Sequence, residues 1–454
     1  MTLSNPSSPE TESDPLVLEK LERFRDMKLG LMLHWGPYSI WGAVESWPIC
    51  NAEPYGRDAL PAWEQSGKDV ERFMEMYFAL NRQFDPVDFD PEAWADAATD
   101  AGMKYLVFTT KHHDGFSMFD TGQTEYRITH PSCPFHQNPN ANVTRVLFDA
   151  FRRCDFQIGA YLSKADWHHH DYWNSDAPRL AREANYDADQ HPVAWGRYVD
   201  FVHKQVEELM TGYGPVDILW LDSDWVRAPH EDIDMPRLAA MARTHQPGLI
   251  VVDRAVGGRY ENYRTPEQTV PDAFLEGVWE SCITMGDQWS FNPADKYKSA
   301  RDLIHMLIRI VARGGNLLLN IGPGPDGCLP QEARDRLAEI GSWLGINGEA
   351  IYGTRPISPH EDGDVYLTRK GDTVYAIVLA EEGQLAPPSD VALPFIEEVQ
   401  SVRMMGDDGD LDWRGDKGGL VVSVSRAICE APPCRYAWTF ALRGAKISNN
   451  PNKD

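Results

Sequence analysis

Two carboxylates stand at the end of the apolar run VDILWLDSDW (216–225), at the point where a buried strand would end. Side chains two apart in a strand share a face, so Trp220 and Asp222 would point one way, and Leu219 and Leu221 the other. An aromatic ring beside a carboxylate suits the binding and ionisation of a sugar, although a lone aspartate at a strand end can also cap the next helix. Asp222 is therefore a candidate catalytic carboxylate.

Hydrolysis of a glycoside needs a second carboxyl group, because one group must be anionic and the other protonated across the scissile bond. Downstream of Asp222 the candidates are Glu267 in YRTPEQ, Glu276 in FLEGVWE and Glu280 in VWESC. Each could also be a solvated loop acid. Asp224 is expected in the loop that follows the strand.

Two histidine clusters raise the alternative of a metal site. In KHHDGF (111–116), His112 and His113 would point to opposite faces of a strand, and Asp114 would be suited to orient one of them. The second cluster, DWHHHDYW (166–173), lacks the spacing of helical zinc motifs. We therefore expect no metal site, and a structural histidine pair is the other interpretation of KHHDGF.

Strand-like and helical runs alternate from about residue 28 to residue 323. Seven short apolar runs are typical of buried strands: 30–36, 105–115, 157–167, 216–225, 248–254, 278–282 and 316–323. Amphipathic runs are typical of helices: 91–102, 143–154, 195–214, 235–246, 297–315 and 330–348. This alternation predicts a parallel sheet, either doubly wound or closed as a barrel.

Side chains of reactive or sugar-contacting types at the strand ends separate the two arrangements. They are His34, Trp35, His112, His113, Asp114, Asp166, Trp167, Asp222, Asp253, Arg254, Glu280 and Asn320. In a barrel all the strands bring their C-terminal ends to one rim, whereas an open sheet has a single crevice. We therefore predict an irregular (β/α)8-like barrel of the TIM type, with seven regular strands.

The pattern changes after residue 353, where short alternating runs separated by turn residues begin. They lie at 364–380, 390–394, 419–425 and 436–442, and they are typical of an antiparallel β-sandwich. The predicted domains are a catalytic barrel over residues 1–355 and a C-terminal sandwich over residues 356–454.

Composition excludes several classes of partner. The net charge of -26 disfavours nucleic acid and anionic lipid, and no apolar run is long enough to span a membrane. No glycine-rich phosphate motif follows a strand, so a nucleotide cofactor is not expected. Seven cysteines without paired spacing argue against a disulfide framework, and the first 16 residues predict no secretory leader and a cytoplasmic location.

Five motifs together resemble α-L-fucosidases of glycoside hydrolase family 29, over about Phe24 to Pro356. They are LHWGPYS, KYLVFTTKHHDGFSMFD, VDILWLD, WESCITMGDQWSF and GGNLLLNIGPGPDG. The resemblance implies a retaining, exo-acting hydrolase with a barrel and a C-terminal sandwich, no cofactor, and fucosylated glycans or glycoconjugates as substrates. Assembly into homo-oligomers is compatible with it.

The resemblance also implies roles for individual residues. Asp222 matches the nucleophile, and the fucose-contacting positions match His34, Glu45, Trp47, His112, His113, Tyr161, Trp220, Arg254 and Trp289. The general acid/base matches either Glu280 in the WE dipeptide or Glu267 in the TPE loop, and Glu280 is preferred. Two alternatives stay open, a catalytically inactive carbohydrate-binding protein on the same fold and a metal-dependent barrel hydrolase.

Overall fold

The computed structural model describes residues 12–179, 181–416 and 419–448. Most of the segment on which the expectation of no secretory leader rests, residues 1–11, lies outside these ranges. Among the described residues, no helix is both long enough and apolar enough to cross a membrane.

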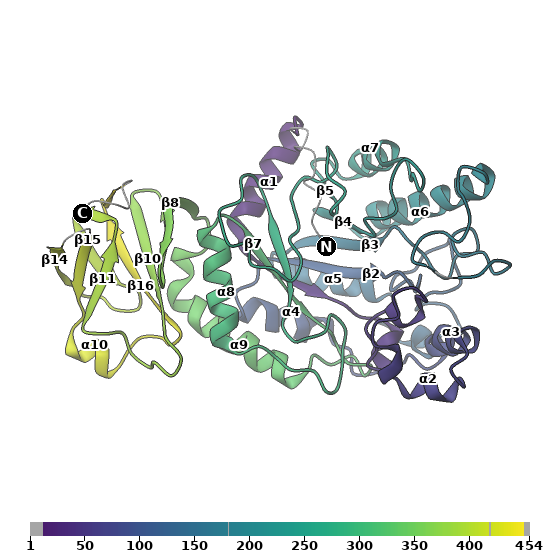
Figure 1. Cartoon of the computed structure of the whole chain (residues 1–454), viewed down its shortest axis with the longest axis horizontal. Helices are drawn as coiled ribbons and strands as arrows, with labels where there is room; N and C mark the ends of the chain where they lie inside the picture. Colours follow the sequence, from purple (N-terminus) through teal and green to yellow (C-terminus); the bar gives the residue numbers. More distant parts are fainter. Residues whose placement is uncertain (1–11, 180, 417–418, 449–454) are drawn as a thin grey trace.

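A parallel sheet of seven strands forms the centre of the larger part of the molecule (Figure 1). In chain order the strands are β1 (Leu29–Leu33), β2 (Tyr105–Lys111), β3 (Gln157–Ser163), β4 (Ile218–Asp222), β5 (Ile250–Asp253), β6 (Glu280–Thr284) and β7 (Asn316–Ile321). Their order in the sheet is β5-β4-β3-β2-β1-β7-β6. All seven predicted strands are present, and the sheet curls into a half-barrel.

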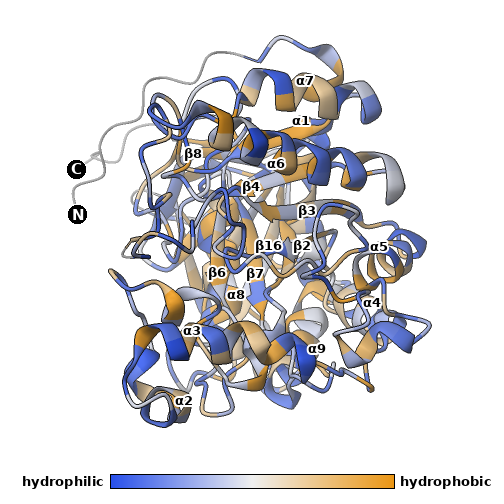
Figure 2. Cartoon of the chain, turned by 90° about the vertical axis from the view of Figure 1, so that its right-hand side faces the viewer, coloured by the Kyte–Doolittle hydropathy of each residue, from blue (hydrophilic) through white to orange (hydrophobic). Residues whose placement is uncertain are grey.

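Helices surround the sheet (Figure 2): most cover its outer face, but the first packs Val17, Leu21 and Phe24 into the apolar cluster inside the curl. They are α1 (Pro15–Met27), α2 (Pro61–Gln65), α3 (Val70–Phe78), α4 (Pro91–Asp100), α5 (Val143–Arg153), α6 (Pro192–Gly212), α7 (Met235–His245), α8 (Ala300–Ala312) and α9 (Gln331–Asn347). Local chemistry sets their starts: Asp90 caps α4 by accepting from the N–H groups of Glu92 and Ala93, and Ser299 caps α8. The observed bounds confirm the predicted helices within a few residues at each end.

Side chains along β4 alternate between the two faces of the sheet, as the sequence predicts. Leu219 and Leu221 belong to the large apolar cluster between the sheet and the helices. Ile218 and Trp220 belong to a smaller cluster inside the curl of the sheet, together with Met32 and other inward side chains. The inward face of β4 therefore leads directly to Asp222 at its C-terminal end.

The gap between the two edge strands, β5 and β6, is spanned by the irregular segment 260–268. On one side, Asp253 N–H donates to the carbonyl of Tyr260 at 2.8 Å. On the other, Glu280 N–H donates to the carbonyl of Arg264 at 2.8 Å, and a parallel bridge joins Glu267 to Cys282. This polar segment takes the place of an eighth strand and brings Glu267 beside the rim.

One predicted strand end is wrong. The run 278–282 would place Glu280 near the C-terminal end of its strand, but β6 begins at Glu280 and continues to Thr284. In the parallel register Glu280 lies opposite Asn316, the first residue of β7, and Thr284 lies opposite Asn320. Four residues of a strand span about 13 Å, so Glu280 lies deep in the barrel and not at the rim.

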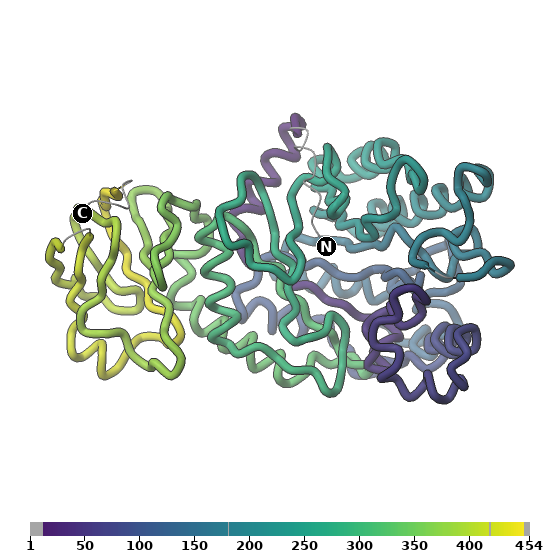
Figure 3. The backbone as a smooth tube through the Cα atoms, in the orientation of Figure 1, coloured from purple at the N-terminus to yellow at the C-terminus, as the bar shows by residue number. Residues whose placement is uncertain are grey.

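The C-terminal part is built of antiparallel strands at one end of the molecule, opposite α2 and α3 (Figure 3). They are β8 (Arg355–Asp362), β9 (Val365–Lys370), β10 (Thr373–Leu379), β11 (Asp390–Pro394), β12 (Ile396–Glu398), β13 (Ser401–Met404), β14 (Asp412–Asp416), β15 (Gly419–Ser423), β16 (Ala437–Arg443) and β17 (Lys446–Ile447). A short helix, α10 (Arg426–Glu430), precedes β16. The sheets have the orders β13-β16-β10-β9-β8, β11-β15-β14 and β12-β17.

Helices α8 and α9 join the two parts. Trp343 on α9 donates its indole N–H to the carbonyl of Ala437 at 3.0 Å, and His305 on α8 lies 2.7 Å from the carbonyl of Tyr436. Arg301 donates to the carbonyl of Ala380. These contacts make the C-terminal sheets a packing partner of the barrel.

Candidate active site

A pocket lies at the C-terminal ends of the parallel strands. Eleven of the twelve predicted site residues line it: His34, Glu45, Trp47, His112, His113, Tyr161, Trp220, Asp222, Arg254, Glu267 and Trp289. Glu280 is not among the residues that line it. The strands thus bring together side chains that are more than 200 residues apart in the sequence.

Asp222, the last residue of β4, presents its carboxylate to this pocket. Its Oδ1 accepts hydrogen bonds from Arg254 Nη1 and from the backbone N–H of Ser223, both at 2.8 Å. Its Oδ2 accepts from the Tyr161 hydroxyl at 2.6 Å, and His113 Nε2 lies 3.9 Å away. The side chain is only 13 % exposed, so both oxygens are held in a fixed orientation.

Opposing effects act on the charge of Asp222. Burial would raise the pKa of its carboxyl group, but the Arg254 guanidinium, His113 and the hydrogen bonds from Tyr161 and Ser223 hold that pKa well below its usual range. Burial would lower the pKa of Arg254, and the carboxylate of Asp222 raises it instead. Asp222 is therefore an anion over the whole physiological range, as a nucleophile must be.

His34 is oriented by Asn320 on β7. Nδ1 of His34 lies 2.7 Å from Oδ1 of Asn320, and Nδ2 of Asn320 donates to the carbonyl of Trp289 at 2.6 Å. The second bond fixes the amide, so Oδ1 is the acceptor and Nδ1 of His34 carries the proton. Burial lowers the pKa of His34 to about 4, which leaves Nε2 of a neutral ring as an acceptor.

His112 and His113 lie side by side in the pocket, contrary to the prediction of opposite faces. β2 ends at Lys111, so strand alternation no longer applies to them, and their ring centroids are 4.1 Å apart. Nδ1 of His112 contacts the Ser46 hydroxyl, and Nδ1 of His113 lies 2.7 Å from the Ser163 hydroxyl. Serines, which the sequence did not indicate, therefore position both rings.

The Asp114 carboxylate has no hydrogen bond to either histidine, so its predicted orienting role is not supported. Its Oδ2 accepts from the Tyr77 hydroxyl at 2.9 Å, and its Oδ1 accepts from the N–H of Phe116 at 3.1 Å. Its own N–H donates to the Ser46 hydroxyl at 3.2 Å. Asp114 thus supports His112 only through Ser46.

Glu45 lies in the left-handed backbone region, with φ at 41°. Its Oε1 accepts from the N–H of Ser290 at 2.8 Å, and the residue is 1 % exposed. Burial raises the pKa of Glu45 to about 7, which the bonds from Ser290 only partly offset. Beside it, the Trp47 ring lies 5.4 Å from His113 and 6.0 Å from Trp225.

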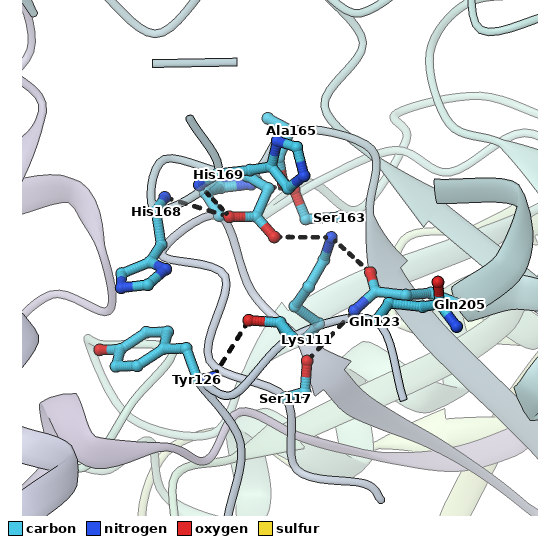
Figure 4. A network of polar contacts seen from close by, with 12 residues as sticks. Lys111, Ser117, Gln123, Tyr126, Ser163, Ala165, His168, His169 and Gln205 are labelled. Atoms are coloured by element: carbon cyan, nitrogen blue, oxygen red, sulfur yellow. Dashed lines mark hydrogen bonds and ion pairs between the residues drawn. The ribbon is translucent and has the colours of Figure 1, made fainter. Parts of the chain in front are cut away.

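The second histidine cluster belongs to a structural network (Figure 4). Lys111 Nζ lies 3.2 Å from Asp166 Oδ2 and 3.0 Å from Gln205 Oε1. Asp166 Oδ1 accepts from the N–H groups of His168 and His169. This buried network ties the end of β2 to the loop after β3.

Two groups of described residues have three donor atoms within 4.8 Å of one another: His112, His113 and Asp222 in the pocket, and Asp88, Asp326 and Cys328 elsewhere. In the first group the Arg254 guanidinium already pairs with Asp222. A cation bound there would be repelled at close range by that charge. The pocket group therefore suits an ion pair better than a metal.

The three candidate glutamates lie in different surroundings. Glu267 lines the pocket, pairs with Arg254 Nη2 and keeps a side chain 42 % exposed. Glu280 is fully buried, and its carboxyl accepts from Tyr105 and from two further side chains of the barrel interior. Burial raises the pKa of Glu280 to about 7. Glu276 is exposed and is not among the pocket residues.

Six further residues line the pocket without having been predicted as site residues: Met32, Arg182, Asp224, Trp225, Ala255 and Cys282. Alternation could have indicated Met32, which shares a strand face with His34, and Cys282, which shares one with Glu280. Asp224 lies in a turn, as expected, yet it still lines the rim. Arg182 lies in the long connection between β3 and α6 and carries no signal in the sequence.

Comparisons with known proteins agree along most of the chain. The sequence model described as Alpha-L-fucosidase matches residues 4–349, and the one described as Alpha-L-fucosidase C-terminal domain matches residues 359–443. The tissue alpha-L-fucosidase of Homo sapiens is 29% identical over 462 residues, which cover 97% of this chain and 92% of that protein. The alpha-L-fucosidase of Branchiostoma floridae is 28% identical and covers 93% of this chain and 92% of that protein.

Solved structures give the same result. Alpha-L-fucosidase isoenzyme 1 from Paenibacillus thiaminolyticus has a TM-score of 0.76 and 29% identity, with 95% of this chain and 100% of that one covered. The Thermotoga maritima alpha-fucosidase, in complex with a mechanism based inhibitor, has a TM-score of 0.71 and 25% identity, with 93% and 96% covered.

Proposed function

The chain belongs to the α-L-fucosidase family of glycoside hydrolases, and we propose that it removes terminal α-L-fucosyl residues from glycans with net retention of configuration. One observation carries the mechanism. Two carboxyl groups, those of Asp222 and Glu267, face one pocket and bind different nitrogens of the same Arg254 guanidinium. A retaining glycosidase requires two carboxyl groups that lie close together.

The pocket suits a 6-deoxy sugar. Polar groups for three ring hydroxyls are available from His34, His112 and Glu45. An apolar wall for the C5 methyl group is available from Trp220 and Trp289, together with the inward side chains of Met32 and Cys282. No cofactor is needed for this chemistry.

The first step requires that Glu267 has taken up a proton in the substrate complex. Asp222 then attacks the anomeric carbon and the bond to the leaving oxygen breaks, while protonated Glu267 donates its proton to that oxygen and becomes a carboxylate. The product is a fucosyl ester of Asp222. Formation of the ester removes the negative charge of Asp222, so Arg254 then pairs with Glu267 alone and favours its carboxylate form. In the second step that carboxylate takes a proton from water, which attacks the anomeric carbon and releases Asp222.

We assign the acid/base to Glu267 and not to Glu280, which the sequence favoured. An acid/base must reach the leaving oxygen and then a water molecule, and the half-exposed side chain of Glu267 at the rim meets both needs. Glu280 has no exposed surface and lies at the opposite end of its strand.

The test compares Glu267→Ala with Glu276→Ala on two substrates, an aryl fucoside with an activated leaving group and an unactivated fucosyl disaccharide. Loss of the acid should slow the disaccharide by at least about 100-fold while sparing the activated substrate, because general acid catalysis contributes roughly 10²–10⁴-fold. Glu276→Ala is the matched control, since it removes a nearby glutamate outside the pocket. An equal loss of rate on both substrates in the Glu267→Ala variant would contradict the assignment.

The nucleophile is tested separately by Asp222→Gly. The variant should lose turnover of the aryl fucoside, and azide should partly restore it by taking the place of the carboxylate. The expected product is the inverted fucosyl azide, identified by NMR. Rescue that gave the retained anomer, or full activity without azide, would exclude Asp222 as the nucleophile.

A further inference from the structure

Glu280 holds an unusual position for a carboxyl group. It is fully buried inside the barrel, below the pocket. Its Oε2 accepts from the Tyr105 hydroxyl at 2.7 Å, and its Oε1 accepts from the Tyr263 hydroxyl at 3.2 Å and from the Trp220 indole N–H at 3.3 Å. All three donors are neutral side chains from three separate segments of the barrel.

The Trp220 indole connects Glu280 to the reacting carboxylate. Trp220 is 2 % exposed. Its indole N–H donates to Glu280, and the residue lines the pocket. The Tyr161 ring stacks on it with centroids 5.3 Å apart, and the Arg254 guanidinium lies 5.3 Å from its centroid. Tyr161 and Arg254 are the two side chains that donate to Asp222.

An apolar residue could fill this site at a lower cost in free energy. Burying a carboxylate away from water is unfavourable, and an apolar side chain of similar volume is often the more stable choice in a protein interior. An apolar replacement, however, would leave the buried N–H of Trp220 without a partner, which is unfavourable and frees the ring to change its tilt. A carboxyl group at this position therefore orients the indole, at a cost in the stability of the folded protein.

We propose that Glu280 is a positioning residue that fixes the Trp220 indole and, through it, the two donors that orient Asp222. Glu280 acts from below the sugar without touching it. This inference rests on the proposed fucosidase function, and it assigns Glu280 a part in the reaction that differs from that of the acid/base.

The experiment compares Glu280→Gln, Glu280→Ala and Tyr105→Phe in the full chain, with rates expressed per active site after titration with a 2-fluoro-fucosyl fluoride. Glu280→Ala should lower kcat by about tenfold or more, because the Trp220 ring loses the hydrogen bond that fixes its orientation. The loss should be the same on activated and unactivated substrates, and the inhibition constant of L-fucose should rise. Glu280→Gln, whose amide oxygen can still accept from Trp220, should recover most of the activity.

Tyr105→Phe is the matched control, because it removes a donor to Oε2 and leaves the bond between Glu280 and Trp220 in place. Its kcat should stay within about threefold of the parent, below the contribution of a typical hydrogen bond. Trp220→Phe combined with Glu280→Ala should be no slower than Trp220→Phe alone, since both changes remove the same N–H to carboxylate bond.

Other outcomes overturn the proposal in distinguishable ways. If Glu280→Ala spares only the activated substrate and azide restores its turnover, Glu280 is the acid/base and the assignment of Glu267 fails. If the melting temperature and the fraction of active sites fall while kcat, KM and fucose inhibition per active site stay unchanged, Glu280 is only structural. If the parent enzyme hydrolyses no fucoside, the proposed function itself fails.

Discussion

Nη1 of Arg254 lies 2.8 Å from Oδ1 of Asp222, and both side chains are less than one-fifth exposed. Burial acts to raise the pKa of Asp222, and the guanidinium is the largest of the effects that lower it. The same guanidinium also pairs with Glu267. Arg254 therefore stabilises the charge of Asp222, the proposed nucleophile, and binds both carboxyl groups of the proposed pair.

Replacing Arg254 with methionine keeps much of the side-chain volume and removes the charge. Burial then raises the pKa of Asp222 without the positive charge that opposes this effect, so the anionic fraction of Asp222 should fall at low pH. We expect kcat/KM to drop by at least about 100-fold, the scale seen when one charge of a buried pair is removed, and the acid limb of its pH profile to move to higher pH. The profile between pH 4 and 8 measures this. An acid limb that stays in place would contradict the role.

The Tyr161 hydroxyl is the only other side-chain donor within hydrogen-bond distance of Asp222 among the described residues. Tyr161→Phe removes that bond of 2.6 Å and should lower kcat/KM by about 10- to 100-fold, the value of a hydrogen bond to a charged group. Tyr198→Phe is the control, because it removes a buried hydroxyl that donates to the carbonyl of Lys164 outside the pocket. Similar losses for both variants would indicate a general packing defect.

Glu45 should give fucose binding a pH dependence near neutrality. Burial raises its pKa to about 7, so it is protonated below that pH and anionic above it. The anion accepts stronger hydrogen bonds from sugar hydroxyls, and the inhibition constant of L-fucose should therefore fall as the pH rises through about 7. His34, His113 and Asp222 do not titrate in this range, because burial lowers the pKa of His34 and of His113 to about 4, and Asp222 stays anionic. Burial also raises the pKa of Glu280 and of Asp114 to about 7, so a variant of Glu45 itself is needed to assign the step.

Glu45→Gln is the variant that tests this assignment. The amide keeps the shape of the side chain and cannot ionise, so its inhibition constant should be flat between pH 5.5 and 8. Fluorescence or calorimetric titration with L-fucose at several pH values provides the measurement. A step near neutrality that survives in Glu45→Gln would show that another group is responsible.

Much of the barrel could be predicted because its strands are apolar runs separated by amphipathic helices. β4 shows why the prediction worked: its leucines face the helices, and Trp220 leads inward to Asp222. The segment 260–268 could not be predicted as part of the sheet, since it is polar, contains a proline and joins β5 and β6 by isolated bridges. Its role depends on the gap between two strands that are distant in the sequence.

Errors in the site came from strand ends. A shift of two residues in β6 moved Glu280 from the rim to the base of the barrel, and the end of β2 before His112 brought two adjacent histidines to the same pocket. The serines that hold the histidine rings have no distinctive pattern, because their roles are set by contacts between loops. Resemblance to a family identified most of the pocket residues, but the different surroundings of Glu267 and Glu280 are visible only in the structure.

Arg182 lies at the rim and should affect the leaving group more than fucose. Its guanidinium lies 4.8 Å from the Trp225 ring centroid, and its carbonyl accepts from the Trp167 indole N–H and the Tyr172 hydroxyl, both at 3.0 Å. A cation held over an aromatic ring at the pocket mouth suits a polar, saccharide leaving group. Arg182→Ala should therefore raise KM for a fucosyl disaccharide by about fivefold or more, the value of a typical hydrogen bond, and leave an aryl fucoside within about twofold. Arg179→Ala, at an arginine of the same connection that is not among the pocket residues, should change neither substrate. Equal effects of Arg182→Ala on the two substrates would place Arg182 on the fucose side of the pocket.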